Sequence, residues 1–134
     1  MVCINCGEKT HVTNSRASRK EASIWRRREC FSCGTLFTTS EMPEYNGSWV
    51  VQSRTGALQP FSPDHLFLSL YKSCEHRQTA LHDARALADT IIRKLGPEVQ
   101  HGVLTAQSII QTAQVALNRF DKAASVHYQA FHQG

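Results

Sequence analysis

The stretch WRRRECFSCG, residues 25 to 34, places three consecutive arginines directly before two cysteines that are spaced two residues apart. A matching C-x-x-C pair stands near the start of the chain, and a glycine follows each pair. Two such pairs separated by a few tens of residues are typical of a structural zinc site with four thiolate ligands. The spacing therefore predicts a small zinc ribbon whose ligands are Cys3, Cys6, Cys30 and Cys33.

The expected ribbon suits zinc chemistry. Zinc binds soft thiolates in a closed tetrahedron, and a pair spaced two apart can present both sulfurs from one tight turn. The glycine after each pair permits the backbone conformation that turns amide N–H groups toward the sulfurs. A redox-active or disulfide-bonded pair is the alternative, but thioredoxin-like chemistry needs one such motif in a βαβ context, which the sequence does not show. Four protein ligands leave no open position, so no metal catalysis is expected.

The basic residues of the ribbon gather between the two cysteine pairs. If residues 24 to 28 form a strand, Arg26 and Arg28 lie on one face, and Trp25 and Arg27 lie on the other. Arginine forks suit phosphate oxygens and guanine edges. We therefore expect Arg26, Arg27 and Arg28 to bind double-stranded DNA, together with Arg16 from a turn-like segment. The alternative is a solvated charge run that keeps a small domain soluble.

Short strands are predicted for the ribbon around Val12 and Ile24, joined by a polar stretch. Trp25 and Phe37 are expected to form its small core rather than platforms on which bases stack.

Composition narrows the class of protein. The chain has 134 residues, 41% of them hydrophobic, and a formal net charge of +4, which leaves a nucleic-acid partner open without requiring one. No apolar run approaches the roughly 20 residues of a membrane span, and the first residues lack a secretion signal. We expect a soluble protein of the cytoplasm that has no membrane partner.

The turn-rich stretch EMPEYNGSW, residues 41 to 49, predicts a domain boundary. The expected domains are the ribbon over 1–43, a linker over 44–48 and a second domain over 49–134. The second domain should open with a β-hairpin that turns near Thr55 and Gly56. The fold class is therefore α+β, with a mostly helical second domain.

Helices are predicted after three capping residues, Ser62, Thr105 and Asp121. Another helix is expected from Leu81 to Leu95, because apolar residues recur there at three and four positions and Gly96-Pro97 then stops the run. The apolar stripes of these helices are interpreted as core. The stripe expected for the last helix consists of Val126, Ala130 and Phe131, and the lone thiol Cys74 is also expected to be packed in the core.

The arrangement resembles the NrdR-type transcriptional repressors of ribonucleotide reductase genes, which join an amino-terminal zinc ribbon to an ATP-cone domain. The resemblance covers nearly the whole chain. In the ribbon it rests on the opening C-x-x-C-G, on Asn14-Ser15-Arg16 and on RRRECFSCGTLFTTSE from Arg26 to Glu41. In the cone it rests on residues 51 to 66 and on the closing FDKAASVHYQAF.

The resemblance implies a bacterial-type, nucleoid-associated repressor whose ribbon binds operator boxes upstream of reductase genes. ATP or dATP in the cone would set the state of a homo-oligomer. Transferred to this chain, the nucleotide would meet Val51, Ser53, Arg54 and His65.

The cone departs from the family pattern at charged positions. Ser53 stands where the family has a lysine that can meet triphosphate oxygens, Thr55 stands at an aspartate, and His65 stands at a second lysine. Ser125 stands where the last helix commonly has a tyrosine. Each lost charge-assisted contact corresponds to roughly 1.5 to 3 kcal/mol, so affinity for a triphosphate should fall about a hundredfold or more.

Three other functions compete with the nucleotide-tuned repressor. One is a divergent repressor that uses the cone only to oligomerise. Another is a zinc-ribbon adaptor that binds proteins of the transcription machinery. The third is an enzyme or enzyme fragment, but no stretch supplies a nucleophile with a base, a carboxylate metal cluster or a phosphate-cradling glycine loop, so no enzyme and no catalytic residue is expected.

Overall fold

A computed structural model of the chain describes residues 1–132. The backbone contacts divide the chain into one unit from Met1 to Pro43 and a second that starts at Glu44. Within residues 1–132, no helix has both the length and the apolar character needed to cross a membrane.

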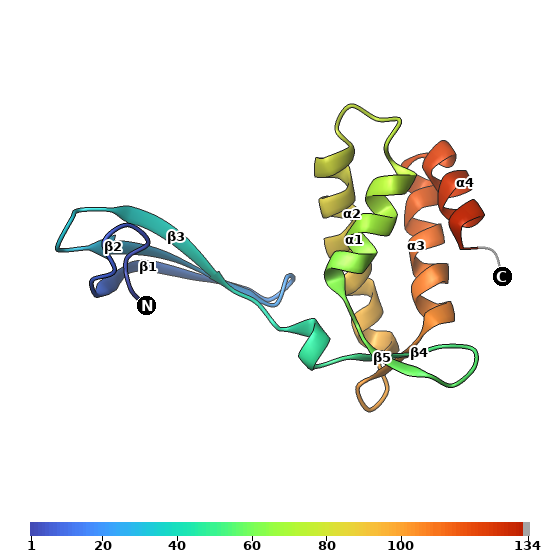
Figure 1. The fold of residues 1–134 in the computed structure, drawn as a ribbon, viewed down its shortest axis with the longest axis horizontal. Helices are drawn as coiled ribbons and strands as arrows, with labels where there is room; N and C mark the ends of the chain where they lie inside the picture. Colours follow the sequence, from blue (N-terminus) through green and yellow to red (C-terminus); the bar gives the residue numbers. More distant parts are fainter. Residues whose placement is uncertain (133–134) are drawn as a thin grey trace. The chain divides into compact units, whose positions relative to one another are not determined.

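The first unit is a three-stranded antiparallel sheet. One turn that bears two cysteines lies before the first strand, and another lies between the second and third strands. The strands are β1 (Thr10–Ser18), β2 (Ser23–Cys30) and β3 (Leu36–Glu41), in the order β1-β2-β3 (Figure 1). The register of β1 against β2 shifts between Val12 and Asn14, which is a β-bulge at Thr13. Two strands of this sheet follow the sequence expectation, whereas β3 adds a third.

The core of this unit is small, as expected for a ribbon. Phe37 is buried, together with two of the cysteines, Cys3 and Cys30. The expectation that Trp25 belongs to the core is wrong, because 36% of its surface is exposed. Phe37 and Trp25 lie on opposite faces of the sheet, since Phe37 pairs with Arg28 and Trp25 pairs with Ser40.

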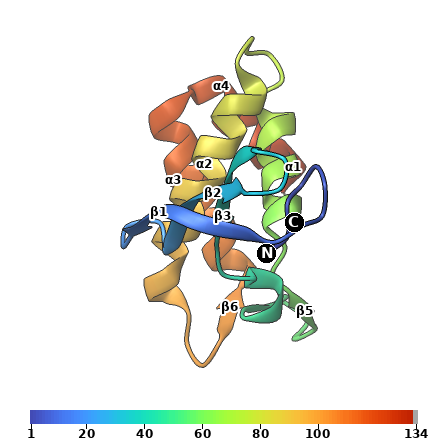
Figure 2. The same ribbon diagram turned by 90° about the vertical axis from the view of Figure 1, so that its left-hand side faces the viewer.

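The second unit combines a small sheet with four helices. After the 3-10 helix η1 (Tyr45–Gly47), β4 (Val50–Gln52) and β5 (Leu58–Pro60) form a hairpin, and β6 (Val103–Thr105) adds to β4 in parallel. The helices are α1 (Pro63–Ser73), α2 (Ala80–Leu95), α3 (Ala106–Phe120) and α4 (Lys122–Phe131), and the 3-10 helix η2 (Gly96–Glu98) follows α2. The sheet lies across the end of the helices at which α1 and α3 begin (Figures 1 and 2).

The three predicted capping residues do cap the N-termini of their helices. The side chain of Ser62 accepts a hydrogen bond from the His65 N–H, Thr105 accepts one from the Ser108 N–H, and Asp121 accepts one from the Ala124 N–H. Each bond satisfies one of the free N–H groups of a first helical turn. Because residues 1–132 combine strands in both units with four helices, the fold class is confirmed as α+β.

The core of the second unit lies between the four helices and the inner side of the sheet. It includes Leu70, Cys74, Ile91, Leu104 and Leu117, all nearly inaccessible to solvent. The packed position expected for the Cys74 thiol is confirmed.

The stripe expected for α4 is wrong. Val126 and Phe131 are exposed by 64% and 60%, whereas Ala124 and Tyr128, one turn apart, are buried. Packing against the other helices turns Ala124 and Tyr128 toward the core, although Val126 and Phe131 are the more hydrophobic candidates.

The residues 44 to 48, expected as a linker, contain η1 and lie in the second unit. The reason is aromatic packing. The ring of Tyr45 lies 4.7 Å from that of Trp49 and 6.4 Å from that of Phe61, which is buried in the core.

Candidate metal centre and nucleic-acid interface

The four cysteines of the two C-x-x-C pairs converge. The Sγ atoms of Cys3, Cys6, Cys30 and Cys33 all lie within 4.8 Å of one another. Two of the separations cross between the pairs, with 3.6 Å from Cys3 to Cys33 and 3.5 Å from Cys6 to Cys30. Sulfurs bound to one zinc ion at about 2.3 Å in a tetrahedron stand about 3.8 Å apart. The donor set therefore fits zinc, and it is positioned to bind a metal ion.

The two cysteine turns are built alike. Gly7 N–H donates to the Cys3 carbonyl at 3.1 Å, and Gly34 N–H donates to the Cys30 carbonyl at 2.9 Å. Both glycines have a left-handed backbone, with φ of +78° and +77°. Each turn thus presents its two thiols from the same local conformation, which is why glycine follows both pairs.

Hydrogen bonds favour the thiolate form at two of the four ligands, Cys3 and Cys33. The N–H groups of Cys6 and Asn5 lower the pKa of Cys3 to about 6, and the hydroxyl of Thr35 lowers the pKa of Cys33. These donors are contacts of the kind that orient metal-bound thiolates.

The sheet of the ribbon carries the predicted DNA-binding arginines on both faces. Residues paired across antiparallel strands share a face. One face carries Ser23, Trp25, Arg27 and Glu29 of β2, and its two central cross-strand rows are here called the indole face. Its rows are Arg16, Trp25 and Ser40, and Asn14, Arg27 and Thr38.

The indole face is open, and its own two rows contain no acid. The next row along β2 on the same side holds Glu29, whose carboxylate lies 3.6 Å from the His11 ring. Most of its side chains are exposed, and Arg27 is half-buried. The guanidinium of Arg16 lies 5.9 Å from the centre of the Trp25 ring, and that of Arg27 donates to the Thr38 hydroxyl at 3.1 Å. Neither arginine forms a salt bridge with any carboxylate in residues 1–132.

The opposite face is partly neutralised and more closely packed. Arg26 forms a salt bridge with Glu41 at 3.1 Å, and the Nε of Arg28 donates to the Thr39 hydroxyl at 3.2 Å. Phe37 is buried on this face. The structure therefore separates the four predicted arginines into two pairs, Arg16 with Arg27 and Arg26 with Arg28.

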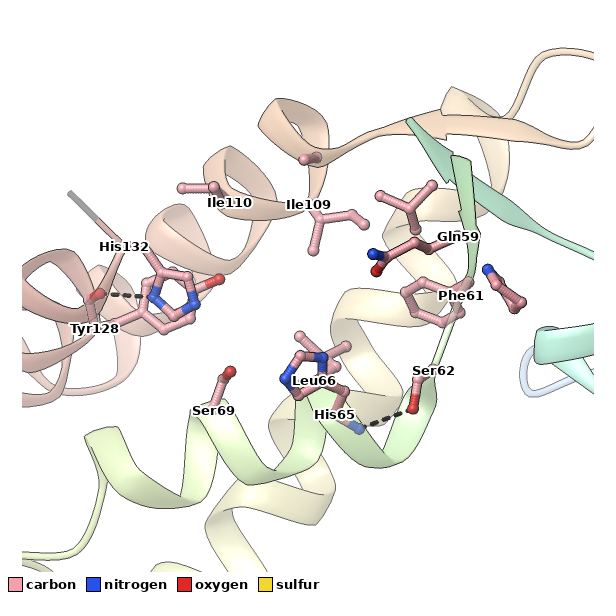
Figure 3. A pocket seen from close by; sticks show the side chains of 13 residues that line it. Gln59, Phe61, Ser62, His65, Leu66, Ser69, Ile109, Ile110, Tyr128 and His132 are labelled. Carbon is pink, nitrogen blue, oxygen red and sulfur yellow. Dashed lines mark hydrogen bonds between the residues drawn. The ribbon is translucent and has the colours of Figure 1, made fainter. Parts of the chain in front are cut away.

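The second unit contains a cavity of about 220 Å³ between β4, β5, α1, α3 and the end of α4. Figure 3 shows Phe61, Leu66, Ile109 and Ile110 on its apolar sides, with His65 among the polar groups. Pockets for small molecules and cofactors usually start at about 300 Å³, so this cavity is smaller than most of them.

Two of the four residues expected to meet a nucleotide line this cavity, and two do not. Val51 and His65 line it. Ser53 and Arg54 belong to the turn between β4 and β5. There the Ser53 hydroxyl lies 2.9 Å from that of Thr55, and the Arg54 guanidinium donates to the Gln107 Oε1 at 3.4 Å. Sequence reasoning missed the contributions of α3 and α4, because their cavity residues are ordinary apolar and aromatic side chains.

Comparison with known proteins extends this picture over the whole chain. Residues 1–41 match the family model described as the N-terminal domain of NrdR-like transcriptional repressors. The transcriptional repressor NrdR of Symbiobacterium thermophilum is 33% identical over 133 residues, which is 99% of this chain and 87% of that protein. The chain belongs to the NrdR family.

Two further relatives agree with this assignment. The NrdR repressor of Thermus thermophilus is 35% identical and that of Geobacter sulfurreducens is 31% identical, in each case over 99% of this chain. The aligned regions cover 84% of the Thermus protein and 88% of the Geobacter protein. The NrdR family is one of transcriptional repressors and not of enzymes, so the expectation of a non-enzymatic regulator is confirmed.

The family resemblance implies an adenine nucleotide in the second unit, and the cavity residues can be tested against that ligand. The apolar walls suit a planar base. None of the cavity-lining residues that the structure describes is a lysine or an arginine. The lining therefore fits an adenine-like group but supplies no fixed positive charge for a triphosphate.

Proposed function

We propose that this chain is a zinc-dependent DNA-binding repressor, with ribonucleotide reductase genes as its target. The observation that supports this proposal best is that Arg16 and Arg27, on one face of a sheet anchored by four cysteines, form no salt bridge with a carboxylate in residues 1–132. Such a protein would act at the nucleoid, in the cytoplasm of a bacterial-type cell.

Zinc acts structurally in this proposal. Bound to Cys3, Cys6, Cys30 and Cys33, it supplies the cross-links that so small a core cannot replace. The sheet then holds the arginines at fixed positions, where their guanidinium groups bind phosphates and displace counterions from the DNA. Phosphate contacts position a protein on the duplex, and contacts to base edges then specify the sequence.

The second unit serves to bring several ribbons together. One ribbon of this size binds DNA weakly, whereas linked copies raise the effective concentration of each ribbon at a neighbouring site. The helices of this unit expose Leu81, Val115, Val126 and Phe131, which are apolar groups available for contact between copies. The expected result is a homo-oligomer that binds paired boxes cooperatively.

ATP or dATP in the cavity would tune this assembly. A second candidate, favoured by the absence of lysine and arginine from the described lining, is a unit that assembles copies without responding to nucleotide. Calorimetric titration with dATP and with deoxyadenosine separates the two. The tuned repressor predicts that dATP binds more tightly, whereas the second candidate predicts that dATP binds no better than the nucleoside.

The repressor proposal is tested by a mobility shift of the zinc-loaded chain on DNA upstream of the host's own reductase genes. A random duplex of the same length is the control, and each probe is run without nucleotide, with ATP and with dATP. Preference for the upstream DNA is the expected result. Equal retention of both probes would contradict reductase genes as the target, and no retention of either would contradict DNA binding altogether.

A further inference from the structure

Trp25 occupies an unusual position in the ribbon. It lies within β2, and 36% of its surface is exposed on a sheet that has few apolar residues to bury. A single exposed apolar residue needs no explanation by itself. The neighbours of this one do suggest a role, because Arg16 lies directly across from it and Arg27 lies two residues along the same face.

The geometry holds the ring and both cations in place. The Arg16 guanidinium lies over the indole at 5.9 Å, within the range of a cation–π contact, and Arg27 is hydrogen-bonded to Thr38. Residues i and i+2 of a strand are about 7 Å apart. The indole face thus presents an apolar ring with one positive group across the strands from it and another along β2, and with the hydroxyls of Thr38 and Ser40 beside them.

The opposite face lacks this arrangement. There Arg26 is paired with the carboxylate of Glu41, and the aromatic residue Phe37 is buried and cannot reach a partner. A polyanion is attracted more strongly to the face whose cations are not already paired.

We propose that Trp25 is a DNA-contacting residue and that duplex DNA meets the indole face. In this arrangement the indole packs against a deoxyribose of the backbone, while Arg16 and Arg27 bind phosphates on either side of that sugar. The inference rests on the proposed function, since it names the surface and the residue through which the ribbon binds DNA.

The chemistry of the two partners matches. The sugar is the least polar part of the backbone and lies between its phosphates, so an apolar ring that has cations on two of its sides complements it. The hydroxyls of Thr38 and Ser40 can donate to phosphate oxygens, as such groups commonly do in protein–DNA complexes. Because these contacts do not depend on base identity, Trp25 should strengthen binding to any duplex.

The first test uses the fluorescence of Trp25 in the full-length, zinc-loaded chain. The chain has two tryptophans, and Trp49 belongs to the second unit, so Trp49→Phe leaves Trp25 as the only one. A short mixed-sequence duplex is added at low ionic strength until binding saturates. The proposal predicts that DNA shields Trp25 from quenching by acrylamide. If Trp25 stays equally accessible in the saturated complex, the proposal is overturned and the proposed function stands.

The second test compares affinities of matched variants for the same duplex by fluorescence anisotropy. Trp25→Ala should weaken binding about tenfold, as expected for losing one buried aromatic contact, and Trp25→Phe should weaken it less. Arg27→Ala and Arg26→Ala remove the same charge from adjacent positions on opposite faces. The proposal predicts a loss at least about fivefold larger for Arg27→Ala, in keeping with one charge-assisted hydrogen bond.

A loss from Arg26→Ala that equals or exceeds the loss from Arg27→Ala would overturn the choice of face. Zinc content of every variant is measured, so that a damaged ribbon is recognised, and the fluorescence test does not depend on any change to the ribbon. If the unaltered chain binds no duplex under these conditions, the proposed function and this inference fail together.

Discussion

At the scale of single residues, Gly34 shows how tightly the cysteine turns are constrained. Its φ of +77° lies in the left-handed region, and a Cβ built on it would meet no atom within 4 Å. The cost of Gly34→Ala is therefore purely that of the backbone, about 1 to 2 kcal/mol. We predict that this variant holds zinc about five- to thirtyfold more weakly, measured by competition with a colorimetric chelator.

The matched control for that variant is Gly47→Ala in η1. No atom lies closer than 3.9 Å to a Cβ at Gly47, and its φ is outside the left-handed range. Zinc affinity of this control should equal that of the unaltered chain. Equal affinity in Gly34→Ala would show that the turn does not need glycine.

Residue-scale features differ in how far the sequence alone predicts them. The four ligands follow from spacing, because the spacing itself creates the turn that presents two thiols. The exposure of Trp25 does not follow from spacing. Alternation assigns Trp25 and Arg27 to one face, but it cannot say that Phe37 is buried on the other side of the sheet.

At the scale of elements, one cluster of ion pairs ties three helices together. Arg77, between α1 and α2, binds Asp83 of α2 at 2.8 Å and Asp121, the cap of α4, at 2.9 Å. Its guanidinium also lies 4.5 Å from the centre of the Phe120 ring at the end of α3. His76 lies 3.1 Å from the same carboxylate of Asp121.

This cluster predicts how stability depends on acid. The Ala124 N–H, His76 and Arg77 lower the pKa of Asp121, and the Thr79 hydroxyl and Arg77 lower the pKa of Asp83. Carboxyls of the unfolded chain titrate near pH 4, above the folded values. The stabilisation is therefore complete above about pH 4 and is lost as pH falls through the folded pKa values.

Thermal melting of the full chain, followed by helical circular dichroism, measures this effect. The melting temperature should fall steeply below about pH 4. In Asp121→Asn, which keeps an acceptor for the cap, the fall should be shallower. Asp89→Asn on α2 is the control, because Asp89 forms no salt bridge in residues 1–132, and it should behave like the unaltered chain. An unchanged acid slope in Asp121→Asn would contradict the assignment.

The elements also show what local patterns miss. The caps at Ser62, Thr105 and Asp121 are predictable because a side-chain oxygen satisfies N–H groups three residues away. The three-residue strand β6 is not, since its pairing with β4 joins residues about fifty positions apart. The buried face of α4 is misread because Val126 and Phe131 are more hydrophobic than Ala124, although packing places Ala124 inside.

At the scale of the whole molecule, the two units are stabilised in different ways. The ribbon buries little more than Phe37 and two of its cysteines, whereas the second unit has an extended core between its helices. Zinc binding should therefore supply most of the folding free energy of the ribbon and little of that of the helices.

Removal of zinc by a chelator tests this difference. The helical circular dichroism signal should persist and melt at nearly the same temperature, while the amide protons of β1 to β3 should lose their protection from hydrogen exchange. Loss of the helical signal along with the zinc would show that the second unit depends on the ribbon for its stability.

The most direct test of the central claim is the affinity of the chain for duplex DNA as a function of salt concentration, with zinc bound and after its removal. Two to four arginines on phosphates predict that log K falls linearly with log salt, with a slope of about −2 to −4 for each bound protomer. Zinc removal should abolish this binding. An affinity that does not change with salt, or that survives without zinc, would contradict a zinc-built arginine surface for DNA.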